Sequence, residues 1–137
     1  MKYLIFYIAL ISQVSFGETK VLDKVAGVIN DQVYTLSEIN RIQQTLPARN
    51  EISGIIYKEL KYSDKEILKI LQHRFIIKDK LAELGLVISD DSVESRIKET
   101  EQRLGLRRQD LLNFLETKNL TFNEYFELIR EAMEYNY

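Results

Sequence analysis

The sequence contains few side chains that could perform chemistry, and His73 is the first to consider. It is the single histidine of the chain, which has no cysteine. An imidazole can transfer protons near neutral pH or bind a metal ion, but both roles need partner groups. His73 stands beside Arg74, with no second histidine and no thiol to complete a ligand set. The sequence therefore favours a structural histidine and predicts no metal site.

Asp90 and Asp91 form the other candidate, because paired carboxylates can exchange protons with a substrate. Adjacent residues on a helix do not face each other, however. Ser89 is a good N-cap, and carboxylates just after it are favourable at the positive end of a helix. The sequence also lacks a glycine-rich phosphate loop, a G-x-S-x-G motif and an H-E-x-x-H motif. We therefore predict no catalytic residues, no enzyme activity and no cofactor.

Binding to nucleic acid is also excluded. The net charge is −2, and the one basic cluster, Arg107 and Arg108 with Arg103 nearby, is better explained as a solvated face. The segment TKNLTFNEY could join the helices of a helix-turn-helix motif, but that motif needs a positive recognition helix. Here the second helix carries Arg130 against four acidic residues, which are Glu124, Glu127, Glu131 and Glu134.

The first 17 residues have the pattern of a secretory signal peptide. Lys2 supplies a positive charge, Tyr3 to Ile11 are apolar, and the small residues Ser15 and Gly17 precede the predicted cleavage site. The apolar stretch is shorter than the roughly 20 residues of a transmembrane helix, so we expect no stable membrane insertion after cleavage. An uncleaved anchor is the alternative. Residues 18–137 then form one domain, whose net charge becomes −3 without Lys2.

A β-hairpin is predicted around Asn30-Asp31. Val21 to Asn30 and Val33 to Leu36 are rich in strand-forming residues, and Asn and Asp tolerate the positive φ of a tight turn. An isolated hairpin is marginal in water, so it must pack on other elements. Thr35-Leu-Ser-Glu38 follows with the pattern of a capping box and predicts a helix that Pro47 ends.

Four further helices are predicted after residue 63. Ser63 to Glu66 is a second capping box, which begins a helix to Leu84 with so many apolar residues that we expect it to be central. Others are predicted over 90–104, over 108–118, and from a third capping box at Thr121 to the end of the chain. Residues 47–63 fit either a short helix or an ordered loop. The predicted fold class is mainly α: a multi-helix domain with one small N-terminal β-hairpin.

Three segments together resemble the N-terminal domain of SurA-type periplasmic chaperones. They are DKVAGVINDQVYTLSEI at 23–39, ILKILQHRFIIKDKLAELGLVISDDSVESRIKETEQRLGL at 67–106 and LLNFLETKNLTFNEYFELIREAM at 111–133. The resemblance implies a periplasmic, ATP-independent chaperone that binds unfolded outer-membrane protein segments through apolar and aromatic side chains. In that family a parvulin-type prolyl isomerase domain and a C-terminal helix follow. Neither is recognisable here, so isomerase activity is not predicted.

The candidate client-binding residues lie on the apolar and aromatic faces of the predicted helices. Such contacts are largely non-directional and suit many extended polypeptides. The sequence does not separate groove residues from core residues. The candidates are Ile39, Ile42, Phe75, Leu112, Phe114, Phe122, Tyr125 and Phe126.

Two alternatives to the chaperone interpretation remain at this stage. One is a structural or assembly subunit, in which the apolar last helix docks on a partner or on a second copy, so that a homodimer replaces the missing helix. The other is a fragment of a larger prolyl isomerase chaperone.

The signal-peptide prediction can be tested by exporting the chain from a Gram-negative host. We expect the secreted product to begin at Glu18, because signal peptidase cleaves after small residues such as Gly17. Intact-mass measurement of the periplasmic fraction checks this. A product that keeps Met1 and stays with the inner membrane would support the uncleaved anchor.

Overall fold

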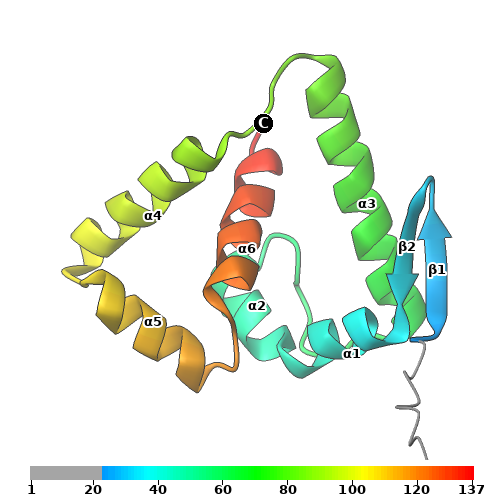
Figure 1. Cartoon of the computed structure of the whole chain (residues 1–137), viewed down its shortest axis with the longest axis horizontal. Helices are drawn as coiled ribbons and strands as arrows, with labels where there is room; N and C mark the ends of the chain where they lie inside the picture. The colour runs from blue at the N-terminus through cyan, green and yellow to red at the C-terminus, as the bar shows by residue number, and fades with distance from the viewer. Residues whose placement is uncertain (1–22) are drawn as a thin grey trace, which may run out of the picture.

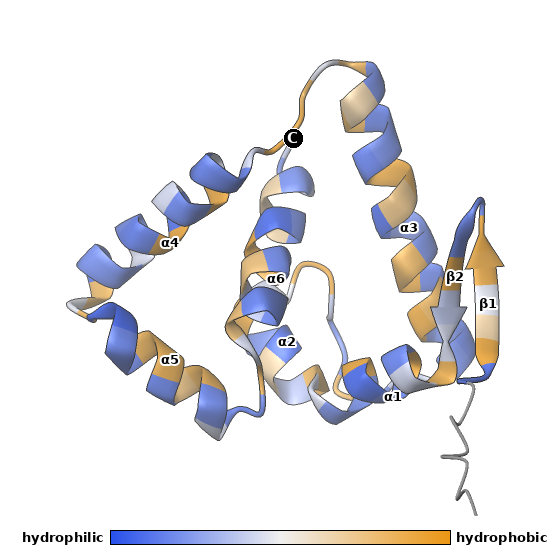
Figure 2. Cartoon of the chain, viewed as in Figure 1, coloured by the Kyte–Doolittle hydropathy of each residue, from blue (hydrophilic) through white to orange (hydrophobic). Residues whose placement is uncertain are grey.

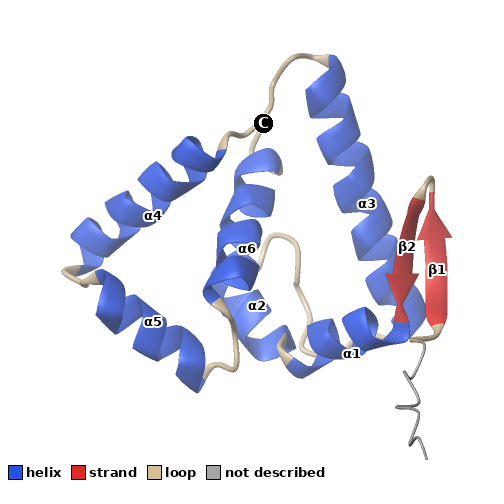
Figure 3. Ribbon diagram, viewed as in Figure 1, coloured by secondary structure: helices blue, strands red, loops and turns tan. Residues whose placement is uncertain are grey.

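A computed structural model of the chain describes residues 23–137, so the predicted signal peptide lies outside the described residues. One hairpin is followed by six helices within this range (Figure 1, Figure 3), which confirms the predicted mainly α fold class. The elements are β1 (Val25–Ile29), β2 (Gln32–Thr35), α1 (Leu36–Gln44), α2 (Leu46–Ser53), α3 (Asp64–Glu83), α4 (Asp90–Leu104), α5 (Arg108–Thr117) and α6 (Phe122–Glu134).

The hairpin forms where the sequence predicts it. Asn30 adopts a positive φ of 51° in the turn, and Val28 pairs with Val33 across the antiparallel strands. The ribbon lies against α3, because a Cβ atom added to Gly27 would approach Leu68 Cδ2 to 2.9 Å. Any larger residue at position 27 would require the Leu68 side chain to move. The small hairpin is thus stabilised by the long helix beside it.

The helix starts follow the capping pattern read from the sequence. In each predicted capping box, the hydroxyl accepts a hydrogen bond from the N–H three residues on, and the glutamate at that position accepts one from the N-cap N–H. Gly85 and Gly105 end the helices before them with φ values of 72° and 66°, as expected of left-handed C-terminal glycines. The three boxes are Thr35–Glu38, Ser63–Glu66 and Thr121–Glu124.

Residues 47–63, for which the sequence allows a short helix or an ordered loop, form most of α2 and then an ordered segment. α1 ends at Gln44, shortly before the predicted end at Pro47. Pro47 itself lies in the first turn of α2, where a missing N–H costs nothing. After α2 the chain is held by Tyr57, whose side chain is fully buried and whose carbonyl accepts a hydrogen bond of 2.5 Å from Asn50 Nδ2.

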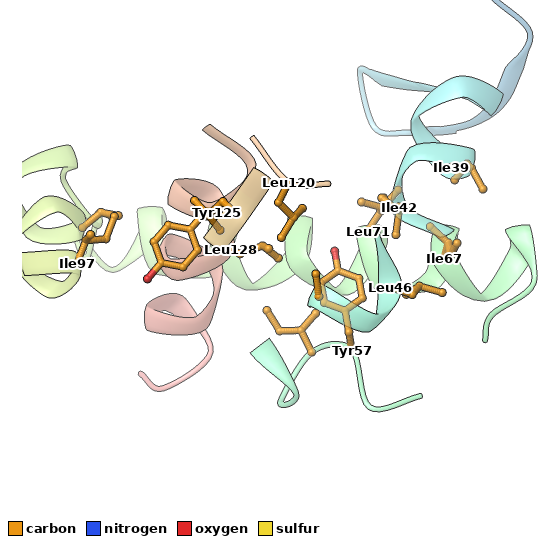
Figure 4. Packing of buried hydrophobic residues seen from close by; sticks show 14 of the residues in the cluster. Ile39, Ile42, Leu46, Tyr57, Ile67, Leu71, Ile97, Leu120, Tyr125 and Leu128 are labelled. Atoms are coloured by element: carbon orange, nitrogen blue, oxygen red, sulfur yellow. The ribbon is translucent and has the colours of Figure 1, made fainter. Parts of the chain in front are cut away.

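The centre of the fold is α6, and the expectation that α3 would be central is wrong. α6 packs against α2, α3, α4 and α5, whereas α3 lies at one side with the hairpin and α1 (Figure 1). The apolar residues of α3 lie on several faces of the helix. One face packs on the core through Ile67 and Leu71, and apolar residues on the other faces, such as Ile76, stay exposed. Figure 2 shows the mixed hydropathy of α3, and Figure 4 shows the core residues that α6 and α3 share.

The core contribution of α3 can be measured by truncating Ile67, which is fully buried. Ile67→Ala removes packed methyl groups and should lower the free energy of unfolding by about 2–5 kcal/mol. Ile76→Ala on the same helix, at a side chain that is 47% exposed, should change it by less than about 0.5 kcal/mol. Urea titration of both variants checks this, and equal effects would contradict the packing described.

Candidate functional site: the groove between α3 and α6

One face of α6 carries a row of acidic side chains. Glu124, Glu127, Glu131 and Glu134 recur at spacings of three and four residues, so they share one side of the helix. All four line a groove whose other wall comes from the hairpin and from α1, α2 and α3. The groove therefore has an acidic wall, and the opposite wall supplies arginines.

Glu124 is the most heavily bonded of these carboxylates. Arg41 donates from Nε to Oε1 at 2.8 Å and from Nη2 to Oε2 at 2.7 Å, a bidentate pair. Arg49, whose side chain is 8% exposed, adds a contact of 3.3 Å from its Nη2. The same carboxylate caps α6 by accepting from the N–H of Thr121 at 2.9 Å. One side chain thus joins α1, α2 and the start of α6.

These bonds determine the charge state of Glu124. Burial alone would raise its pKa, but hydrogen bonds from Arg41 and from the Thr121 backbone and hydroxyl favour the ionised form and lower the pKa to about 2. Glu124 is therefore a carboxylate throughout the physiological pH range.

A second ion pair lies seven residues, or about two turns, further along α6. Glu131, with a side chain only 6% exposed, pairs with Arg74 of α3. Two atoms of this pair, Glu131 Oε2 and Arg74 Nε, are buried without a hydrogen-bond partner among the described residues. A buried pair with unsatisfied atoms costs desolvation energy. The contact therefore fixes the geometry of α3 against α6 more than it stabilises the fold.

Arg130 holds the loop between α3 and α4 against α6. Its Nη1 donates to the carbonyl oxygen of Ile88 at 2.7 Å, and its Nη2 lies 2.5 Å from Asp90 Oδ1. Asp90 is thus used in an ion pair at a helix start, not in acid–base chemistry.

The groove has a volume of about 720 Å³ and a mixed lining. Its apolar part comes from Tyr34, Ile42, Leu71 and Phe75. A smaller hollow of about 320 Å³ adjoins the groove and shares part of its charged lining. Further apolar side chains, from the end of α3 and the loop that follows, line this hollow. The shared residues are Lys78, Glu127, Arg130 and Glu134, and the added apolar ones include Leu81, Leu86 and Val87. The two hollows therefore adjoin each other along α3, and each has apolar side chains in its lining.

The structure separates the eight predicted client-binding residues into three groups. Ile39, Ile42 and Tyr125 are buried in the core, although Ile42 also borders the groove. Phe75 is half-buried and lines the groove. The others lie on α5 and α6, outside the groove: Leu112, Phe122 and Phe126 are half-buried, and Phe114 is 43% exposed.

The aromatic residues of α6 are covered by arginines. Phe122 packs against Tyr125 and Phe126 at ring-centroid distances of 6.4 and 6.2 Å. The guanidinium of Arg108 lies 5.0 Å from the centroid of Phe122, and that of Arg130 lies 5.4 Å from Phe126. Arg108 of the sequence's basic cluster also pairs with Glu94 and Glu101. Arg103 and Arg107 are exposed, so these two residues form a solvated face, as the sequence predicted.

Sequence reasoning missed the arginines that define the groove. Arg41, Arg49 and Arg74 stand alone in the sequence, and their partners lie on α6, far along the chain. The acidic row on α6 was visible in the sequence, and its regular spacing was the one signal that pointed to a basic surface opposite it.

The described residues offer no other kind of site. Three or more His, Asp or Glu side chains do not gather within residues 23–137 in a way that could hold a metal ion. No helix in this range combines the length and apolar character needed to cross a bilayer. His73 is exposed, on α3. The site that remains is the groove.

The fold and groove define a class of protein: a mainly helical domain with a partly apolar groove between α3 and α6. The chain is similar to curated proteins named chaperone SurA, which confirms the resemblance read from the sequence. It is 28% identical to that of Legionella pneumophila strain Lens over 133 residues, 24% to that of Escherichia coli O157:H7 over 136 residues, and 22% to that of Buchnera aphidicola from Schizaphis graminum over 138 residues.

The similarity covers 91–96% of this chain but only 29–32% of the relatives, so the chain spans about a third of their length. No protein-family model matches the chain, and no solved structure matches it. The groove is accordingly described from this structure alone.

The groove contacts predict an acid-sensitive stability. Because the pKa of Glu124 falls from 4.5 to about 2 on folding, its stabilisation is present above about pH 4.5 and is lost as the pH falls toward 2. Glu124→Gln should cost about 2 kcal/mol at pH 7, since it leaves two arginines poorly paired. The difference in free energy of unfolding between this variant and the wild type should shrink as the pH approaches 2.

Glu127→Gln is the matched control, because Glu127 is 55% exposed and its ion pair is a local one to Arg130 at 3.3 Å. It should change stability by less than about 0.5 kcal/mol. Urea titrations at pH 7, 4 and 3 measure both variants. A Glu124→Gln effect that is the same at all three pH values would contradict the assignment.

Proposed function

We propose that the chain is an ATP-independent chaperone module of the periplasm, which binds unfolded outer-membrane protein segments in the groove between α3 and α6. The observation that carries the proposal is the similarity to chaperones named SurA over nearly the whole chain. The predicted signal peptide supports the compartment. The groove supports the mode of binding.

The lining of the groove fits an extended, partly apolar polypeptide. Strands of outer-membrane barrels alternate apolar and polar side chains over about 10 residues. Tyr34, Leu71 and Phe75 offer apolar contact, which is not directional and so accepts many sequences. The charged rims keep the groove open to water when it is empty.

Among the eight candidates from the sequence, we assign Phe75 as the direct client contact in the groove. Ile42 is buried but also borders the groove, and Ile39 lies in the core on the same helix, α1. Phe114, exposed on α5, provides a second apolar contact outside the groove. The others, Leu112, Phe122, Tyr125 and Phe126, would reach a client only at their exposed edges.

Self-association is the competing function, and one surface favours it. Leu84, Leu86 and Val87, at the end of α3 and in the loop after it, are 72%, 43% and 74% exposed. An apolar patch of this kind can mark a protein–protein contact. If it pairs two copies, sedimentation velocity will show a dimer that Leu84→Ser combined with Val87→Ser dissociates.

The chaperone proposal is tested by diluting a urea-denatured outer-membrane barrel protein into buffer and following its aggregation by light scattering. Residues 18–137 at several-fold molar excess should suppress the scattering without ATP. Phe75→Ala should weaken the suppression severalfold, because it removes apolar surface from the groove. Ile76→Ala, one residue further on α3 at an exposed position, should not.

The absence of any suppression at all excesses would reject the chaperone proposal. Equal losses in the Phe75 and Ile76 variants would reject the groove as its site.

A further inference from the structure

The ion pairs across the groove leave one acidic side chain without a partner. Glu124 is engaged by Arg41 and Arg49, and Glu131 is engaged by Arg74. Glu134 lies seven residues after Glu127 and is half-buried. Its side chain makes no hydrogen bond or ion pair within residues 23–137. Burial raises the pKa of Glu134, and the nearby charge of Lys78 opposes this. A half-buried carboxylate without a partner is costly unless a cation reaches it.

The cations that line the groove do not meet this need. The arginines each hold another acceptor: Arg130, the nearest on α6, is bonded to Ile88 and Asp90. Lys78 of α3 lines both hollows together with Glu134, but it is an exposed residue and no ion pair within 4 Å joins its ammonium to that carboxylate in residues 23–137. Lys78, Arg130 and Arg74 therefore act on Glu134 only through their charge, and none of them forms an ion pair with it within residues 23–137.

Apolar side chains lie on both sides of Glu134. Leu71 and Phe75 lie in the main groove, while Leu81, Leu86 and Val87 line the adjoining hollow, and Glu134 lines both. An extended chain rises about 3.3 Å per residue, so a segment along α3 can place apolar side chains in each hollow and a residue between them near Glu134. Lysine or arginine suits this place, because its methylene stem packs on apolar surface while its charged end reaches the carboxylate.

We propose that the groove selects apolar polypeptide segments that contain a lysine or arginine, and that Glu134 accepts this basic group. This inference rests on the proposed function, since it assigns a preference to the same groove. The basis for the occupant is charge complementarity: an unpaired, half-buried carboxylate between two apolar hollows.

The test uses two acetylated, amidated and dye-labelled peptides, Thr-Phe-Thr-Phe-Lys-Phe-Thr-Phe-Thr and the same sequence with Gln in place of Lys. Fluorescence anisotropy with residues 18–137 at 50 mM salt should give an affinity for the Lys peptide about fivefold higher, the size expected of one partly buried ion pair. The ratio should fall toward one at 500 mM salt, because salt screens the pair.

Variants locate the preference. Glu134→Gln should remove this preference, so that the two peptides bind with similar affinity, and Glu134→Lys should reverse it. Glu116→Gln, at an exposed position on α5 that lines neither hollow, is the matched control and should keep the preference. Lys78→Gln, which removes the competing cation, should increase the affinity for the Lys peptide about twofold.

Each outcome separates this inference from the proposed function. Equal binding of both peptides by the wild type, or a preference that survives in Glu134→Gln, overturns the role of Glu134 while the groove stands as a client site. If neither peptide binds, the groove itself is rejected as a client site, and the inference is rejected with it.

Discussion

The carboxylate of Glu124 takes part in two structures at once: the start of α6 and the ion-paired contact of α6 with α1 and α2. It accepts the N–H of Thr121 in a capping box and two hydrogen bonds from Arg41. Local helix formation and long-range docking therefore use the same atoms. Because α6 packs against four of the other helices, the position of the whole helical body depends on this one group.

The contact between α3 and α6 has a different character from the core. Ile67, Leu128 and their neighbours pack as an ordinary apolar interior, but Arg74 and Glu131 meet beside the groove with one buried atom each that has no hydrogen-bond partner within residues 23–137. Replacing such a pair with apolar side chains often stabilises a protein. The ion pair instead joins α3 to α6 beside a groove that leaves room of about 720 Å³. That room is what the proposed binding of a polypeptide requires.

Local sequence signals predicted the elements well. Thr35, Ser63 and Thr121 each start a helix through a hydroxyl and a glutamate three residues on, and Asn30 forms the hairpin turn at a positive φ. These features are determined by residues within one turn of each other, so they can be read from the sequence.

The arrangement of the elements was less predictable. The number of apolar residues on α3 suggested a central helix, but exposed Ile76 and Leu84 account for part of that number. The pairing of Arg41 with Glu124 joins residues 83 positions apart. Nothing in the spacing of either residue identifies the other. The groove could not be predicted from the sequence for the same reason, since it exists only between elements that such long-range pairs bring together.

The hairpin has a consequence for how the protein behaves at high concentration. Within residues 23–137 its sheet contains only two strands, and Val28 and Val33, paired across it, are 60% and 51% exposed. A ribbon of this kind offers backbone edges and an apolar face to any third strand, including one from an identical molecule. Its polar turn, Asn30 to Gln32, protects one end and not the sides. At high concentration, copies of the protein would therefore compete with other chains for the same β-ribbon.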